Sequence, residues 1–144
     1  MIIAVIDGQG GGIGRAFCEK LKAALPGQKI LALGTNSAAT GQMIKGGADE
    51  GATGENAIVC NVPKVDIICG VIGILNANSM LGELTPKMAV AIGSSNAYKV
   101  LLPINRCHIH VVSIDEMSLG QHIDNAVAEI LRYIKEQHPE NCKM

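Results

Sequence analysis

The sequence predicts an α/β fold: a Rossmann-like, three-layer α/β/α domain with a mainly parallel sheet of about five strands. Two observations predict it. Short apolar runs alternate with amphipathic helical patterns along the chain, and the first run, residues 2–6, leads through a glycine-rich turn directly into a helix. Parallel strands joined in this way need right-handed crossovers. The length of 144 residues suits one domain, which we expect to span residues 1–144.

Four apolar runs predict strands, and four longer periodic patterns predict helices. The clearest helical pattern comes last, where apolar residues recur at helical spacing from Ile123 to Ile134. Pro26-Gly27 ends the first helix, and Thr85-Pro86 is typical of an N-cap followed by proline. The predicted strands are 2–6, 29–34, 65–70 and 99–103; the predicted helices are 13–25, 37–45, about 118–136, and one from Thr85-Pro86 to near Gly93.

Three further segments have weaker patterns. Residues 108–114 predict one more strand, and residues 49–56 predict a polar, glycine-rich loop. Residues 55–62 form either a short helix or a strand, because the apolar run is too short for its periodicity to separate the two.

The amino-acid composition indicates which kinds of partner the protein can have. Charged residues make up 17% of the chain and the net charge is −1, so no basic surface for nucleic acid is expected. Aromatic residues make up 2%, so few side chains are present on which bases could stack. Five cysteines without a C-x-x-C pair predict free thiols. We find no signal peptide or membrane span, and expect a cytoplasmic protein without a membrane partner. Hydrophobic residues at 48% favour a homo-oligomer over a monomer with an apolar surface.

The glycine-rich segment, residues 7–14, is the strongest functional signal. It follows a strand, opens a helix and has the spacing G-x-x-x-G-I-G. Glycines let a backbone approach a phosphate closely, and the helix that follows offers unpaired N–H groups and a positive dipole end. The alternative is a tight strand–helix crossing that needs glycine only for packing. The candidate ligand-binding residues here are Asp7, Gly8, Gln9, Gly10, Gly11, Gly12, Ile13 and Gly14.

The expected ligand is a small phosphorylated compound, with NAD(P) or another nucleotide as the leading cofactor class. NAD sites usually carry an acidic residue after the second strand, where this chain has Thr35-Asn36-Ser37, and no nearby arginine suits a 2′-phosphate. The Tyr-x-x-x-Lys pair of short-chain dehydrogenases is absent. Gly14-Arg15-Ala16 also stands where a Walker ATPase has Gly-Lys-Ser/Thr. Arg15 contacts a phosphate or is a solvated arginine of the first helical turn.

Further polar residues follow the predicted strands, and ligands of open α/β sheets lie beyond the carboxyl ends of the strands. Asp7 and Glu50 are possible bases or magnesium ligands, although capping of the glycine turn is the simpler role for Asp7. His108 and His110 share one face of a predicted strand while Cys107 points to the other, so we expect no metal site. The remaining candidates for ligand contact are Thr35, Asn36, Asn76, Asn78, Ser79, Asn105 and Arg106.

Five segments carry a resemblance to a known family. They are residues 6–14, 32–36, 47–56, 78–83 and 105–107, containing Ile-Asp-Gly-Gln-Gly-Gly-Gly-Ile-Gly at the start and Asn-Arg-Cys at the end. Together they resemble an uncharacterised bacterial domain-of-unknown-function family, found largely in anaerobic Gram-positive bacteria, and this resemblance implies no established activity. Residues 97–105 and the glycine-rich segment are also similar to the phospholactate transferase and gluconeogenesis-factor superfamily, whose members bind phosphorylated or nucleotide ligands.

Three functions remain in order of preference. The first is a nucleotide-binding module without chemistry of its own, because the glycine-rich segment lacks the catalytic pairs that usually accompany it. The second is a small enzyme, either an NAD(P)-linked reductase or a phosphate-ester transferase, favoured by the polar residues at the strand ends. The third is a structural subunit of an oligomer in which the glycines serve packing alone.

Overall fold

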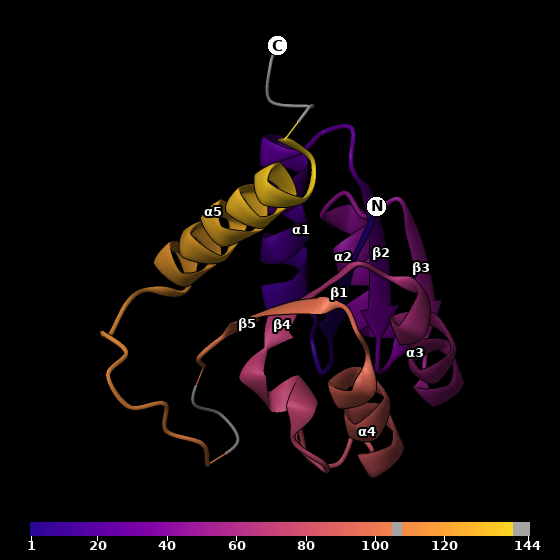
Figure 1. Ribbon diagram of the computed structural model, residues 1–144. Helices are drawn as coiled ribbons and strands as arrows, with labels where there is room; N and C mark the ends of the chain where they lie inside the picture. The colour runs from indigo at the N-terminus through magenta and orange to yellow at the C-terminus, as the bar shows by residue number, and fades with distance from the viewer. Residues whose placement is uncertain (105–107, 140–144) are drawn as a thin grey trace.

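The computed structural model describes residues 1–104 and 108–139. Five strands form one parallel sheet in the order β3-β2-β1-β4-β5. The strands are β1 (Ile2–Asp7), β2 (Lys29–Gly34), β3 (Glu50–Thr53), β4 (Ile67–Val71) and β5 (Tyr98–Leu102). This confirms the predicted α/β class and Rossmann-like fold. Within the sheet, β1 has β2 on one side and β4 on the other (Figure 1).

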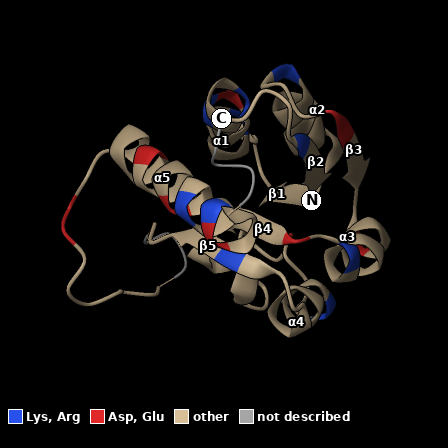
Figure 2. Ribbon diagram, turned by 45° about the horizontal axis from the view of Figure 1, so that its top comes forward, with Lys and Arg blue, Asp and Glu red and all other residues tan. Residues whose placement is uncertain are grey.

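Helices cover both faces of the sheet, which gives the three layers seen in Figure 2. Helices α1, α2 and α5 pack on one face, and α3 and α4 pack on the other. Their bounds are α1 Gly12–Ala24, α2 Ser37–Lys45, α3 Glu55–Asn61, α4 Pro86–Ser94 and α5 Leu119–Gln137, with short 3₁₀ turns at Val62–Lys64 and Ile72–Leu75.

Two apolar layers hold these elements together. Phe17 and Leu21 of α1 are fully buried against Ile3 and Ile30 of the sheet. On the other face, α3 and α4 bury Ile58 and Ile92 against the alternate side chains of the same strands. Because strands β1 and β2 are buried on both faces, they are continuous apolar runs, which is why the sequence alone could locate them.

Two predictions about local structure were wrong, and one open question is answered. Residues 49–56 are not wholly a loop, because β3 pairs with β2 from Leu31↔Glu50 to Gly34↔Thr53. Residues 55–61 are helical. Residues 108–114 are not a strand: His108 and Ser113 have φ of 54° and 65°, in the left-handed region that extended backbone cannot adopt.

Both ends of the described chain lie at the amino edge of the sheet. Met1 precedes β1 and lines one surface depression together with Asp66, Gln137 and His138. The end of α5 therefore lies beside the start of β1, near the top of Figure 1. No helix within the described residues is long and apolar enough to cross a membrane.

Candidate functional site

The glycine-rich segment turns the chain sharply from β1 into α1. The Asp7 carboxylate holds this turn, because it accepts hydrogen bonds from the backbone N–H groups of Gly8 (2.8 Å) and Gly14 (2.7 Å). The Gly11 N–H donates to the carbonyl of Gly8 (3.0 Å), which closes the turn at its base. Asp7 is 6% exposed, so these bonds satisfy a buried carboxylate. The capping role predicted for Asp7 is confirmed.

Three of the glycines are required for close packing. A Cβ on Gly11, whose φ is 75°, would lie 2.7 Å from the Cα of Ala39 in α2. A Cβ on Gly14 would lie 2.8 Å from Met43, and one on Gly8 would lie 2.5 Å from the Thr35 hydroxyl. Each distance is shorter than real Cβ contacts, so a side chain at Gly8, Gly11 or Gly14 would displace its neighbours, and the three glycines let the turn lie against α2 and the end of β2.

Gly10 and Gly12 differ from these three. A Cβ on either residue would meet no atom within 4 Å, and neither residue has a left-handed φ. Among the described residues, the backbone N–H groups of Gly10, Gly12 and Ile13 have no hydrogen-bond acceptor. The segment therefore presents open backbone donors at the N-terminus of the 13-residue helix α1, where the helix dipole is positive.

A cavity of about 320 Å³ lies against this segment. It opens beyond the carboxyl ends of β1 and β4, the two strands between which the strand order reverses. Ligands of open α/β sheets bind at this switch point. Its walls come from the glycine-rich segment, the end of β4, the turn after it and the segment after β5: Asp7, Gly8, Gln9, Ile13, Val71, Gly73, Ser79, Met80, Leu81 and Ile104.

The turn over residues 78–83 forms one wall of the cavity and has unusual backbone geometry. Asn78, Met80 and Leu81 have φ between 56° and 66°, the left-handed region, and Gly82 has φ of 89°. Hydrogen bonds hold the turn in place: the Leu84 N–H donates to the Ser79 carbonyl (3.2 Å), and the Ser79 hydroxyl donates to the Gly73 carbonyl (2.6 Å). Left-handed residues cluster at binding and catalytic sites, where the surrounding structure fixes them.

Glu83 reaches from this turn to the end of β2. Its Oε1 accepts hydrogen bonds from the Gln9 N–H (2.9 Å), the Thr35 hydroxyl (2.8 Å) and the Asn36 amide (2.7 Å). The hydrogen bond from the Gln9 N–H is the main cause that lowers the pKa of Glu83 below its ordinary range, and those from Thr35 and Asn36 add to it. Hydrogen bonds thus fix the Glu83 carboxylate beside the glycine-rich segment, on the side of β2.

The structure brings together most of the residues that the sequence predicts. Asp7, Gly8, Gln9, Ile13 and Ser79 line the cavity. Thr35 and Asn36 do not line it, but both bond to the Glu83 carboxylate, which also bonds to the N–H of Gln9. Arg15 points along the helices instead, where it bonds to Glu19 and Gln42. Asn78 belongs to the turn and Asn76 precedes it, but neither is in the cavity wall. Asn105 and Arg106 lie outside the described residues.

Sequence reasoning missed Glu83, Met80, Leu81 and Ile104. Glu83 had a usable signal, because it lies in the segment after a buried strand, where the carboxyl-end rule places ligand contacts. Leu81 had none. Its side chain is 98% exposed at the mouth of the cavity, and only the structure shows that position.

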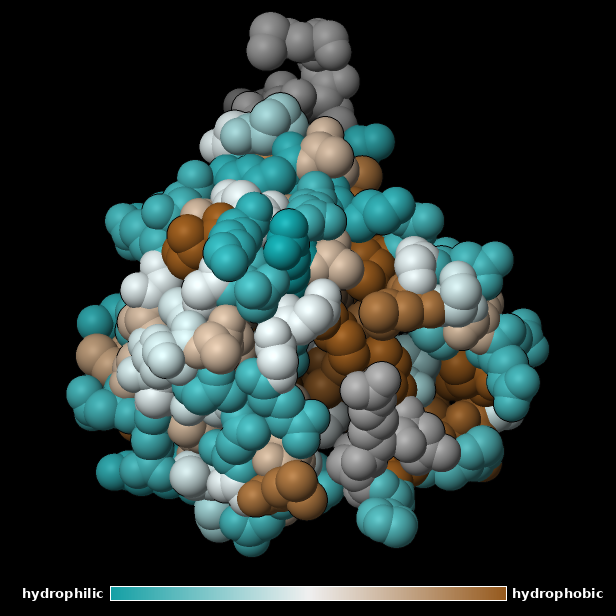
Figure 3. Space-filling view, turned by 180° about the vertical axis from the view of Figure 1, so that it is seen from behind, coloured by the Kyte–Doolittle hydropathy of each residue, from teal (hydrophilic) through white to brown (hydrophobic). Residues whose placement is uncertain are grey.

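A second cavity of about 440 Å³ adjoins the first through Ile13 and Ile104. Seen from behind, this side of the molecule is hollowed and rich in hydrophobic surface (Figure 3). The wall of this second cavity includes Ile114, Met117 and Leu119, which are 39–49% exposed. It also includes the titratable residues His110, Asp115, Glu116 and His122. Within the described part of the chain, no three His, Cys, Asp or Glu side chains are grouped to hold a metal ion, and Cys107 lies outside that part.

Comparison with known proteins agrees with the first resemblance seen in the sequence. One family model, described as Domain of unknown function (DUF3842), matches residues 2–135. Neither the curated proteins nor the solved structures include a match. The likeness to the phospholactate transferase and gluconeogenesis-factor superfamily therefore stays a prediction. Because the family model covers nearly all of the sequence, the chain belongs to the DUF3842 family of domains of unknown function.

Proposed function

We propose that this protein binds a nucleotide or a small phosphorylated cofactor at the carboxyl edge of its sheet. The observation that carries the proposal is the cavity of about 320 Å³, walled by the glycine-rich segment at the switch point between β1 and β4. Its volume falls within the usual range for small-molecule sites, and its wall combines apolar side chains with a few polar groups, as such sites do.

The backbone donors of the segment support a phosphate as the anchoring group. The N–H groups of Gly10, Gly12 and Ile13 have no acceptor among the described residues and lie at the positive end of α1. Packing explains Gly8, Gly11 and Gly14 but gives no reason for glycine at positions 10 and 12. A close approach by a ligand does give a reason, which favours binding over the packing-only hypothesis.

We prefer the hypothesis that the protein binds this ligand without catalysing a reaction on it. Among the described residues that line this cavity, Asp7 is the one titratable side chain, and its oxygens already hold two backbone N–H groups. An NAD(P)-linked reductase or phosphate-ester transferase is the second form. It is supported by the adjoining cavity, where His110 and His122 could act as acids or bases near a bound substrate.

A homo-oligomer also remains a proposal. Val112 is 73% exposed, and Ile114, Met117 and Leu119, which follow it within seven residues, are 39–49% exposed, so several apolar side chains meet solvent in the single chain. Burial between subunits would remove these side chains from water. Size-exclusion chromatography with light scattering measures the subunit number directly, and a monomer at all concentrations would remove this support.

Thermal shift with a dye tests the proposed binding, because the protein has no tryptophan to report unfolding. The panel is NAD, NADP, ATP, GTP, FMN, UDP-glucose, coenzyme A and inorganic phosphate, with and without magnesium. A compound at 100 times its Kd adds about 2.7 kcal/mol, which raises the Tm by roughly 5 °C or more in a domain of this size.

Three variants locate the binding. Gly12→Asp should fold, because a Cβ there meets no atom within 4 Å and a carboxylate suits a helix N-terminus, yet its charge repels a phosphate. Gly12→Ala tests the added Cβ alone. Gly27→Asp makes the same charge change at another open glycine, in the turn after α1. We expect Gly12→Asp to lose the shift, Gly12→Ala to reduce it because the added Cβ occupies the space of the ligand, and Gly27→Asp to keep it. A shift retained in Gly12→Asp would place the ligand elsewhere, and no shift with any compound would favour the packing-only hypothesis.

A further inference from the structure

A carboxylate lies at the end of β2, although no acidic residue follows this strand in the sequence. In dinucleotide-binding folds an acidic residue at this position binds the ribose hydroxyls, and here Thr35 and Asn36 follow the strand instead. The structure places Glu83 at the same position from a distant segment. Its Oε1 binds both of these residues and the Gln9 N–H of the glycine-rich segment at 2.7–2.9 Å.

Three segments fix the position of this carboxylate. Gln9 lies in the glycine-rich segment, Thr35 follows β2, and Asn36 is the N-cap of α2, where it also accepts a hydrogen bond from the Ala39 N–H (2.9 Å). The backbone of Glu83 is held as well, because its N–H donates to the carbonyl of Met80 (3.1 Å). A side chain fixed in this way can discriminate between ligands, because it does not need to be ordered when the ligand binds.

The two oxygens of Glu83 differ in their bonding. Oε1 accepts three hydrogen bonds, whereas Oε2 accepts none from the described residues. A carboxylate has capacity for about four hydrogen bonds in total, so Oε2 retains room for hydroxyl donors. The carboxylate is ionised at neutral pH because the donors on Oε1, the Gln9 N–H first, lower its pKa.

We propose that Glu83 is a specificity-determining residue that accepts hydrogen bonds from the free hydroxyls of a ribose. The inference rests on the proposed function, since it assigns the phosphate to the open N–H groups of Gly10, Gly12 and Ile13 and the sugar to Glu83 on the β2 side. A second phosphate on that ribose would face the carboxylate, and no arginine or lysine of the described residues bonds to Glu83 to offset the repulsion. The site therefore takes nucleotides whose ribose is not phosphorylated.

Two matched pairs of compounds test this selectivity. NAD and NADP differ by one 2′-phosphate, and dephospho-coenzyme A and coenzyme A differ by one 3′-phosphate. Isothermal titration calorimetry on the wild-type chain should show that the member with the free ribose binds more tightly, by about tenfold or more, as expected for an unpaired like-charge contact. This comparison needs no variant, so it stands even if a substitution at Glu83 impairs folding.

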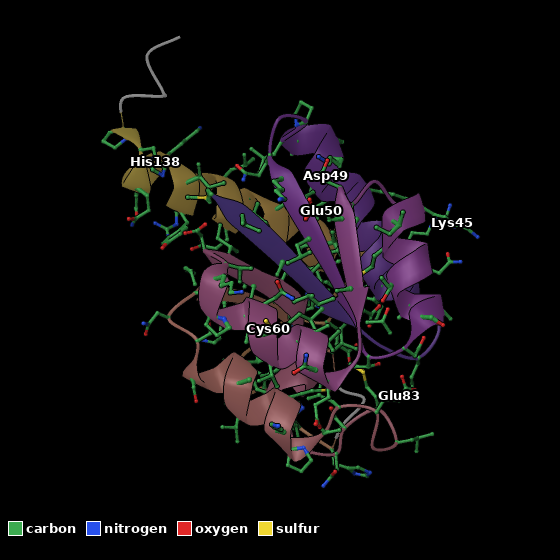
Figure 4. All side chains as sticks on the ribbon, turned by 90° about the vertical axis from the view of Figure 1, so that its right-hand side faces the viewer. Lys45, Asp49, Glu50, Cys60, Glu83 and His138 are labelled. Atoms are coloured by element: carbon green, nitrogen blue, oxygen red, sulfur yellow. The ribbon has the colours of Figure 1, made fainter. Side chains whose placement is uncertain are left out.

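Glu83→Gln then assigns the selectivity to the carboxylate. Glutamine keeps the shape of the side chain and an oxygen acceptor but loses the charge, so the ratio of the two Kd values within each pair should fall toward one. Glu50→Gln is the control, because it removes the same charge at the opposite end of the sheet (Figure 4). A purely structural role for Glu83 would lower the Tm in Glu83→Gln and leave the ratio unchanged.

The outcomes separate the two proposals. Equal or tighter binding of the phosphorylated members to the wild-type chain, or a ratio that survives Glu83→Gln, overturns the role of Glu83 while the binding site stands. Absence of binding by all four compounds and by every other nucleotide of the thermal-shift panel rejects the proposed function and this inference with it.

Discussion

Adjacent glycines of the same turn should respond in opposite directions to alanine. At Gly11 the backbone has a φ of 75°, and a Cβ would lie 2.7 Å from the Ala39 Cα and 3.0 Å from the Ala39 carbonyl oxygen. The left-handed conformation costs about 1–2 kcal/mol for alanine. Overpacking against the α2 backbone costs about 1–3 kcal/mol more. Gly11→Ala should therefore lower the free energy of unfolding by roughly 2–5 kcal/mol.

Gly12→Ala should have no such cost. Gly12 is the first residue of α1, its φ is not left-handed, and a Cβ would meet nothing within 4 Å. Alanine restricts the unfolded chain more than glycine does, so the substitution should stabilise the protein by about 0.4–1 kcal/mol. The contrast thus separates a glycine that packing requires from one that packing does not.

Urea unfolding followed by far-UV circular dichroism measures both changes, because the helices and the sheet report without tryptophan. If Gly11→Ala stayed within about 0.5 kcal/mol of the wild-type chain, the close approach of the turn to α2 would be refuted. A large destabilisation by Gly12→Ala would show that position 12 has a structural requirement which the fold does not reveal, and would weaken the argument that this glycine is kept for a ligand.

The remaining predictions concern titratable groups. The folded pKa of Glu83 is lowered, so its charge contributes stability that is present above its unfolded pKa and lost as the pH falls through the folded pKa. Glu83→Gln should thus destabilise the protein at pH 7 and by less at about pH 3.5, and equal urea midpoint differences at both pH values would contradict this. Burial raises the pKa of Cys18 to about 12 and also raises that of Cys69, whereas Cys60 is exposed. Iodoacetamide at pH 8 should alkylate Cys60 in the native protein and reach Cys18 and Cys69 only after unfolding, as peptide mass spectrometry would show.

The parts of the fold that the sequence could predict are those whose apolar pattern is decided locally. The runs that form β1 and β2 are buried on both faces, and the pattern of α5 follows from a single buried stripe. β3 escaped prediction because its four residues, Glu-Gly-Ala-Thr, have little strand preference. Its conformation comes from pairing with β2 at the edge of the sheet.

The candidate site likewise has a part that the sequence could predict and a part that it could not. The glycine-rich segment could be predicted because strand, turn and helix follow one another directly in the chain. Glu83 could not be paired with Thr35 and Asn36, since 47 residues or more separate them and only the crossover from β3 to β4 brings them together. The predicted strand at 108–114 failed for another reason: Val112 and Ile114 remain exposed, and the segment does not join the sheet.

The position of Met1 beside the end of α5 has a practical consequence. Met1 and Gln137 lie together at the amino edge of the sheet, and the cavity at the switch point opens at the carboxyl edge. An affinity tag, a fluorescent fusion or a sensor-chip linkage joined to Met1 would thus leave the protein on the side away from the candidate site. Immobilised protein would present the cavity to the flowing solution, so surface-based screening of compound libraries suits this fold without any redesign of its loops.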